Sequence, residues 1–185
     1  MTGGVRAVRT DELRSVIPTL RAGDRIALTG TVYTARDAAH KELFRLLDAG
    51  EPLPFELRDA AIYYAGPTPG HDGMAVGSCG PTTSSRMDRF APRLLDLGLA
   101  AMIGKGGRSR EVRDAIVRNG AVYLCAVGGA GALIARQIRA AEEIAFPELG
   151  CESIKKLTVE ELVLTVGCDA AGGDLFEQGI AQYAL

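Results

Sequence analysis

The sequence of 185 residues predicts one α/β domain with a largely parallel sheet and covering helices. Segments typical of strands alternate with segments typical of helices from about residue 25 to residue 166. Apolar residues make up 47% of the chain and charged residues 24%, which is ordinary for a globular protein with a sizeable core. The length favours a single domain over residues 1–185, in which residues 1–20 are expected to form a peripheral arm.

The first half of the chain contains three predicted strands and two predicted helices. Residues 25–33 form a largely apolar run with β-branched side chains, which predicts a strand. Thr34 can cap the next helix with Asp37 as its partner, and Gly50 can end that helix. The further elements of this half are strands over 60–64 and 74–78 and a helix that ends at Gly98.

The same alternation continues through the second half. Ser109 can cap a helix that ends at Gly120. Glycines within 128–131 lead into a helix that is expected from about residue 132 to residue 143. The remaining predicted strands cover 100–103, 122–127 and about 162–166.

Charge and cysteine content exclude several classes of protein. Lys and Arg number 21 and Asp and Glu number 23, a net charge of -2 that argues against binding nucleic acid or an anionic membrane surface. The uncharged run over 121–135 is too short and too rich in glycine to span a bilayer. The four cysteines form no CxxC pair, so this chain alone predicts no metal site. We expect a cytoplasmic protein with reduced thiols.

Three loops at predicted strand ends share one design. Each is rich in Gly, Thr or Ser, carries a cation and leads into a helix. For any single loop, a solvated surface cation is the simpler explanation. Together the loops favour a small anion with several charges, because ligands of open α/β sheets bind at the carboxyl ends of the strands. The loops are 34–37 with Arg36, 80–86 with Arg86, and 104–107 with Lys105.

Two phosphate-binding motifs are incomplete in this chain. A P-loop is excluded because five residues, not four, separate Gly98 from Gly104, and Gly106 stands where Ser or Thr is needed. A dinucleotide-binding motif would place a third glycine at Ile134. The glycines before Ile134 are therefore better explained by tight packing of a helix against a strand.

Candidate acid–base groups are few. His40 lies four residues after Arg36 on a predicted helix, so it can bind a ligand carboxylate or orient Arg36. Thr82 and Thr83 supply hydroxyl groups, at least one of which is expected to cap the next helix. Cys79 has no histidine near it in sequence and is expected to lie in the core. The chain thus offers groups that hold an anion without a complete catalytic set, which is typical of half an active site.

The motifs GTVYTARDAAH (30–40), GPTTSSRMD (80–88) and IGKG (103–106) occur in this order along the chain. They resemble the β subunit, or the C-terminal domain in fused forms, of class I iron–sulfur fumarate hydratases. The β subunit of L-tartrate dehydratase shares the pattern. The similarity extends from about residue 21 to residue 176. It implies a three-layer β/β/α swivelling domain with a mixed, partly parallel sheet.

The resemblance also implies a partner and a cofactor. In the family, a separate α subunit holds a [4Fe-4S] cluster through three cysteines and leaves one iron open to act on the substrate as a Lewis acid. The chain described here would bind no metal and would supply half of the site of a hydro-lyase that reversibly hydrates fumarate to L-malate. A hetero-oligomer with two copies of each subunit is implied.

The resemblance assigns roles to seven residues of this chain. The first threonine of GPTT is the candidate for proton transfer, although hydrogen-bond donation is an equal alternative. The aspartate and histidine of TARDAAH are expected to contact the residues that bind substrate and not the substrate itself. The assignments are Arg36 and Lys105 to the substrate carboxylates, Thr82, Thr83 and Arg86 to the pocket lining, and Asp37 and His40 to the supporting positions.

Two stretches depart from the pattern of many fumarate hydratases and leave the substrate open. They are residues 150–156 and residues 172–174. Tartrate is therefore the alternative substrate. A third hypothesis is a non-catalytic dicarboxylate-binding module, which would bind the diacid as an isolated chain, whereas half a site would not.

Overall fold

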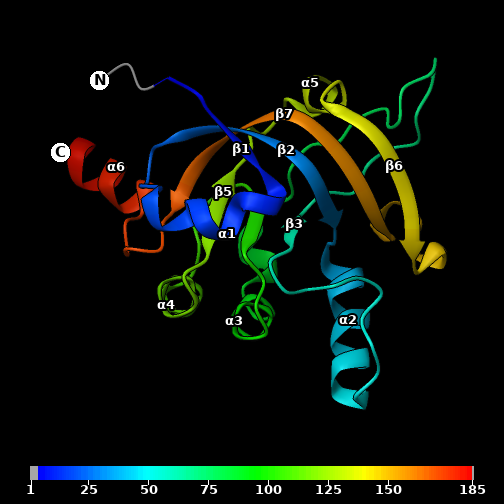
Figure 1. Cartoon of the computed structure of the whole chain (residues 1–185), viewed down its shortest axis with the longest axis horizontal. Helices are drawn as coiled ribbons and strands as arrows, with labels where there is room; N and C mark the ends of the chain where they lie inside the picture. Colours follow the sequence, from blue (N-terminus) through cyan, green and yellow to red (C-terminus); the bar gives the residue numbers. More distant parts are fainter. Residues whose placement is uncertain (1–3, 185) are drawn as a thin grey trace.

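Seven strands form one mixed sheet in the computed structural model, which describes residues 4–184 (Figure 1). Strands β1 to β5 run parallel to their neighbours, and β7 runs antiparallel to β2, β5 and β6. The α/β class and the partly parallel sheet are thus confirmed. In sheet order the strands are β1 (Arg6–Arg9), β2 (Arg25–Thr34), β3 (Ala61–Tyr63), β4 (Ala101–Gly104), β5 (Val122–Cys125), β7 (Ile154–Cys168) and β6 (Ile138–Ala145).

Short and long helices connect these strands. No helix within residues 4–184 is long and apolar enough to cross a membrane. The α-helices are α1 (Leu13–Val16), α2 (Asp37–Ala49), α3 (Ala91–Asp96), α4 (Arg110–Asn119), α5 (Gly131–Ala135) and α6 (Leu175–Tyr183). The 3-10 helices are η1 (Thr10–Glu12), η2 (Ile17–Thr19), η3 (Ser84–Met87) and η4 (Pro147–Glu152).

Strand β7 pairs with both β2 and β5, and so closes β2, β3, β4, β5 and β7 into a ring. The register of β2 against β7 shifts between Leu28 and Gly30, where Gly30 has a φ of +131°. A Cβ at Gly30 would lie 2.1 Å from Oγ1 of Thr10, an oxygen that accepts the backbone N–H of Thr31 at 3.0 Å. Glycine is required at this irregularity, which lets β2 bend around the ring.

Alternate residues of the central strands face two separate cores. In β3, Ala61 and Tyr63 join the core enclosed by the strands, whereas Ile62 joins the core beneath the helices. Figure 1 shows α2, α3 and α4 together on one side of the sheet. The helix residues that fill this second core include Ala39, Leu43, Leu94, Val112 and Ile116.

Residues 4–20 do not form the peripheral arm that the sequence predicts. Strand β1 pairs in parallel with the first half of β2, and the segment that follows it packs against the sheet. The side chains of Leu13, Ile17 and Leu20 are at most 1% exposed and belong to the core enclosed by the strands. Residues 1–3 of the predicted arm lie outside the described part of the chain.

In the second half, most of one predicted helix is a strand, β7 begins at Ile154 rather than near residue 162, and α6 was not predicted. The helix expected over 132–143 ends at Ala135, and β6 follows it as an edge strand paired with β7. Ala, Arg and Glu in this stretch favour a helix, but pairing with the fifteen-residue β7 overrides the local preference.

In the first half, the strand expected over 74–78 is reduced to a single bridge between Pro69 and Val76.

Helix ends are predicted better than helix starts. Gly50 and Gly120 end α2 and α4 in the left-handed conformation, and Ser109 caps α4 by accepting the N–H of Val112. Thr34 does not cap α2, whose N-cap residue is Arg36. The hydroxyl of Thr34 is instead buried, where it accepts the N–H of Lys155 at 3.0 Å. Thr34 therefore fixes the end of β2 against β7.

Candidate active site

The carboxyl ends of β2, β3 and β4 meet at one edge of the sheet, because these strands are parallel neighbours. Arg36 follows β2, and Lys105 directly follows β4. The loop with the two threonines lies between them. Thr82 donates its N–H to the carbonyl of Tyr64 at 2.6 Å, and Thr83 forms a parallel bridge with Lys105. The threonine loop is therefore joined by backbone contacts to the residue after β3 and to the loop after β4.

Asp37 links the two arginines of the site. Arg86 donates from Nε to Oδ1 of Asp37 at 3.0 Å, and its Nη2 lies 2.9 Å from Oδ2 of Asp37. Nη2 of Arg36 lies 4.0 Å from the same Oδ2. Arg36, Arg86 and Lys105, which the sequence predicts to converge, are thus brought to one edge. The structure also places the carboxylate of Asp37 beside the two arginines.

A second carboxylate, missed by the sequence interpretation, belongs to the site. Glu152, the last residue of η4, accepts the N–H of Ala38 through Oε2 at 2.9 Å. Its Oε1 lies 3.4 Å from Nη2 of Arg36. No pattern near Glu152 marks this role, because the contact joins residues more than 110 positions apart. Only the pairing of β7 with β2 brings them together.

Lys105 differs from the two arginines because it has no carboxylate partner among residues 4–184. Its side chain lies along bare backbone: a Cβ at Gly128 would lie 3.4 Å from Cδ of Lys105 and 3.7 Å from Nζ. The neighbouring residue Val127 is 69% exposed, and Leu133 of α5 is 65% exposed. A cation without a carboxylate partner among the described residues therefore lies beside Gly128, the residue that follows the exposed Val127.

His40 is buried behind this edge and neutral at pH 7. Its Nδ1 lies 2.8 Å from the carbonyl oxygen of Arg36, so Nδ1 carries the proton and donates it. Its ring packs against Tyr64 and Phe90. Burial lowers the pKa of His40 to about 4. His40 is fully buried, and its hydrogen bond holds the backbone of Arg36.

The low pKa of His40 predicts a pH-dependent stability. Between pH 6.5 and about 4, the unfolded chain binds a proton at His40 that the folded chain does not. The free energy of unfolding is therefore complete above pH 6.5 and falls by about 3 kcal/mol as the pH drops to 4. Urea unfolding of wild type and His40→Gln between pH 7.5 and pH 4 measures this. Carboxylates titrate in both proteins, so equal pH slopes would contradict the prediction.

A buried ion pair supports the loops from within the core beneath the helices. Arg108, whose side chain is 0% exposed, donates from Nε to Oδ1 of Asp88 at 2.8 Å. Its guanidinium carbon lies 5.4 Å from the ring centre of Tyr64 and 4.9 Å from that of Tyr123. The hydroxyl of Tyr123 donates to the carbonyl of Gly106 at 2.8 Å. The loop after β4 is thereby tied to β5.

The two buried cysteines among the described residues are neutral thiols. Cys79 is buried, and burial raises its pKa to about 12, so it is a neutral thiol. Burial also raises the pKa of Cys168. Between residues 4 and 184, no group of three or more His, Cys, Asp or Glu side chains could hold a metal ion. The cysteines of this chain therefore do not fit an iron–sulfur cluster.

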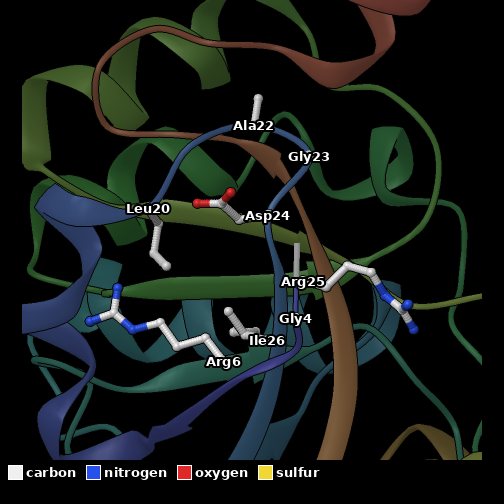
Figure 2. Close-up of a pocket in the computed structure, with 8 residues that line it drawn as sticks. All are labelled: Gly4, Arg6, Leu20, Ala22, Gly23, Asp24, Arg25 and Ile26. Carbon is white, nitrogen blue, oxygen red and sulfur yellow. The ribbon is translucent and has the colours of Figure 1, made fainter. Parts of the chain in front are cut away.

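A cavity of about 590 Å³ lies at the opposite end of β2 and is lined by Arg6 and Arg25 among others (Figure 2). Figure 2 shows the guanidinium groups of these two arginines pointing away from each other. These two arginines therefore do not face a common point. The candidate site is therefore assigned to the edge that carries Arg36 and Lys105.

Comparison with known proteins identifies the family of the chain. The family model described as the fumarase C-terminus matches residues 4–179. The chain is 44% identical over 156 residues to "Fumarate hydratase class I, anaerobic" of Escherichia coli (strain K12), covering 83% of this chain and 28% of that protein. It is 38% identical over 173 residues to "Fumarate hydratase 2" of Leishmania major, covering 92% of this chain and 30% of that protein.

A different relative matches over nearly its whole length. The chain is 32% identical over 182 residues to "L(+)-tartrate dehydratase subunit beta" of Escherichia coli (strain K12), covering 96% of this chain and 87% of that protein. By contrast, the chain spans about 30% of the length of the fumarate hydratases it matches. The family match and these identities confirm the resemblance, and the chain belongs to the fumarase C-terminus family.

Proposed function

We propose that this chain is the carboxylate-binding half of the active site of a hydro-lyase that reversibly hydrates fumarate to L-malate. One observation carries the proposal: Arg36, Arg86 and Lys105 come from three different loops and lie at one edge of the sheet. A diacid with two negative charges suits such a set, because arginine binds a carboxylate through two N–H groups and lysine adds a point charge. The identity to two fumarate hydratases supports this substrate.

Each residue of the site has a task in this proposal. Arg36 and Lys105 bind the substrate carboxylates, and Arg86 and Thr83 line the pocket. When a proton leaves carbon, negative charge develops on the adjacent carboxylate, and cations that are already in place stabilise it. Thr82 lies beside them and either transfers this proton or donates a hydrogen bond.

We assign the remaining half of the site to a cluster-bearing partner, the α subunit. The cysteines of this chain do not fit a [4Fe-4S] cluster, so the cluster is assigned to the partner. Val127, which precedes the Gly128 that Lys105 lies against, is exposed, as is Leu133 of α5, and exposed apolar side chains are expected where another polypeptide completes a site. One relative is itself named as a subunit, "L(+)-tartrate dehydratase subunit beta", which supports a separate partner. A complex with two copies of each subunit, in the cytoplasm, completes the proposal.

The three-layer β/β/α swivelling arrangement is part of the same proposal. Its support is the ring of five strands around one core and the second core beneath α2, α3 and α4. In this arrangement the strands form two layers and the helices the third, and the site lies where the parallel strands end.

The proposal is tested by anaerobic co-expression of the chain with a cluster-bearing α subunit, followed by assays with L-malate and with L-tartrate. We expect the complex to dehydrate malate and the isolated chain to be inactive. Preferred turnover of tartrate would establish the alternative substrate, which the tartrate dehydratase relative favours. Turnover by the isolated chain would refute the half-site. Tight fumarate binding by the isolated chain together with an inactive complex would indicate a non-catalytic module.

The role of Thr82 predicts different effects of two substitutions. If its hydroxyl transfers the proton, Thr82→Ser keeps most activity and Thr82→Val lowers kcat by about 10²–10⁴-fold. If it only donates a hydrogen bond, Thr82→Val costs about 10-fold or less. Steady-state kinetics of the complex measure the difference. We expect the larger loss in Val, and equal activity of the Ser and Val variants would remove Thr82 from the reaction.

A further inference from the structure

Glu152 lies between the start of α2 and the guanidinium of Arg36. Its Oε2 is fixed by the N–H of Ala38 at 2.9 Å, while its Oε1 lies 3.4 Å from Nη2 of Arg36. The side chains of Glu152 and Arg36 are each 22% exposed, so water screens their attraction only in part. The carboxylate is thus held by the backbone and presents its second oxygen to one end of the guanidinium.

Gly66 restrains the other end of the same guanidinium. A Cβ at Gly66 would lie 3.2 Å from Nη1 and 3.3 Å from Cδ of Arg36, and 3.1 Å from the carbonyl oxygen of Cys151. Nη1 therefore lies against bare backbone, and Nη2 faces Glu152. Nε of Arg36 is buried and has no acceptor among the described residues. The guanidinium is held on two sides before any ligand arrives.

We propose that Glu152 is a positioning residue, which holds Arg36 in the orientation that binds a substrate carboxylate. The proposal rests on the proposed function. An unrestrained arginine has many rotamers, and fixing one of them upon binding weakens affinity. Glu152 fixes the orientation in advance. In this proposal Arg36 binds the carboxylate remote from the carbon that loses its proton, whose charge is the same in the ground state and in the transition state, so misplacing Arg36 raises KM and leaves kcat largely unchanged.

Two variants separate this role from simple capping of α2. Glu152→Gln keeps an oxygen that accepts the N–H of Ala38 but turns an amide NH₂, which cannot accept a hydrogen bond, toward Arg36. Glu152→Ala removes both contacts. If Glu152 only caps the helix, Glu152→Gln behaves as wild type; if it positions Arg36, both variants show the defect. Glu148→Gln is the matched control, because Glu148 lies in the same η4, is exposed and has no polar side-chain contact within residues 4–184.

The first measurement needs no activity. In ¹⁵N NMR spectra of the 185-residue chain, the Nε–H signal of Arg36 is identified by its loss in Arg36→Lys. We expect slow hydrogen exchange of this signal in wild type and in Glu148→Gln, and exchange faster by about 10-fold or more in Glu152→Gln and Glu152→Ala. An unchanged Arg36 signal in Glu152→Gln would overturn the positioning role, whatever reaction the complex catalyses.

The second measurement uses the complex with its cluster-bearing partner. We expect Glu152→Gln to raise KM for malate by about 10-fold with kcat within about 3-fold of wild type. In an Arg36→Ala background the same substitution should have no further effect, because Glu152 acts through Arg36. An additive effect, or a KM lowered by loss of the negative charge, would overturn the proposal. An inactive wild-type complex would refute the proposed function instead and leave the NMR result to decide the positioning role.

Discussion

Replacing Lys105 with methionine is expected to lower kcat/KM for malate by about 30- to 5,000-fold in the assembled complex. The figure corresponds to about 2–5 kcal/mol, the usual effect of removing one partner of a buried, hydrogen-bonded charge pair. Lys105 is the cation of the site without a carboxylate partner among the described residues, so its charge is available to the substrate. Steady-state kinetics with malate measure the loss.

The same substitution should leave the folded chain unharmed. Methionine retains the apolar stem that lies along Gly128, and no carboxylate of residues 4–184 loses an ion pair. The midpoint of thermal unfolding is therefore expected to change little. Lys41→Met is the matched control, because Lys41 is exposed on α2 and has no such place at the site. Equal activity of the two variants would show that Lys105 does not bind substrate.

Local patterns predicted the elements whose own sequences decide their structure. The left-handed glycines Gly50 and Gly120 and the capping residue Ser109 define helix ends through interactions within a few residues. β6 was mistaken for a helix because its preference is decided by pairing with β7, which a local pattern does not contain. The closure of the ring by β7 was missed for the same reason, since β7 pairs with β2 and β5, which both lie far from it in sequence.

The site likewise contains residues that local patterns predict and residues that only long-range contacts bring into place. Arg36, Arg86 and Lys105 could be predicted to converge because each follows a strand or opens a helix, and parallel strands bring such positions to one edge. Their roles in the reaction stay predictions. Glu152 could not be found, because its contact with Arg36 depends on the ring. The position of Arg108 was equally hidden, since nothing in the sequence shows that this arginine lies inside the core.

Replacing Asp88 with alanine is expected to lower the free energy of unfolding by about 3–5 kcal/mol, the largest loss of stability that we predict. The carboxylate accepts from Nε of Arg108 at 2.8 Å and from the N–H of Ser109 at 2.7 Å. Removing it leaves the fully buried guanidinium of Arg108 without its counter-charge. Urea unfolding of the 185-residue chain at pH 7 measures the effect.

A second substitution tests whether the loss of stability comes from the uncompensated charge of Arg108. In Asp88→Ala/Arg108→Met no buried charge remains, and methionine can fill part of the space between Tyr64 and Tyr123. The double variant should therefore be more stable than Asp88→Ala alone, because buried ion pairs add little once both partners are replaced by apolar groups. Asp114→Ala breaks an exposed pair with Arg110 on α4 and should cost less than about 1 kcal/mol. If Asp88→Ala costs no more than Asp114→Ala, the loops of the site do not depend on this pair, and the ties through Tyr123 and the parallel bridge to Lys105 must hold them instead.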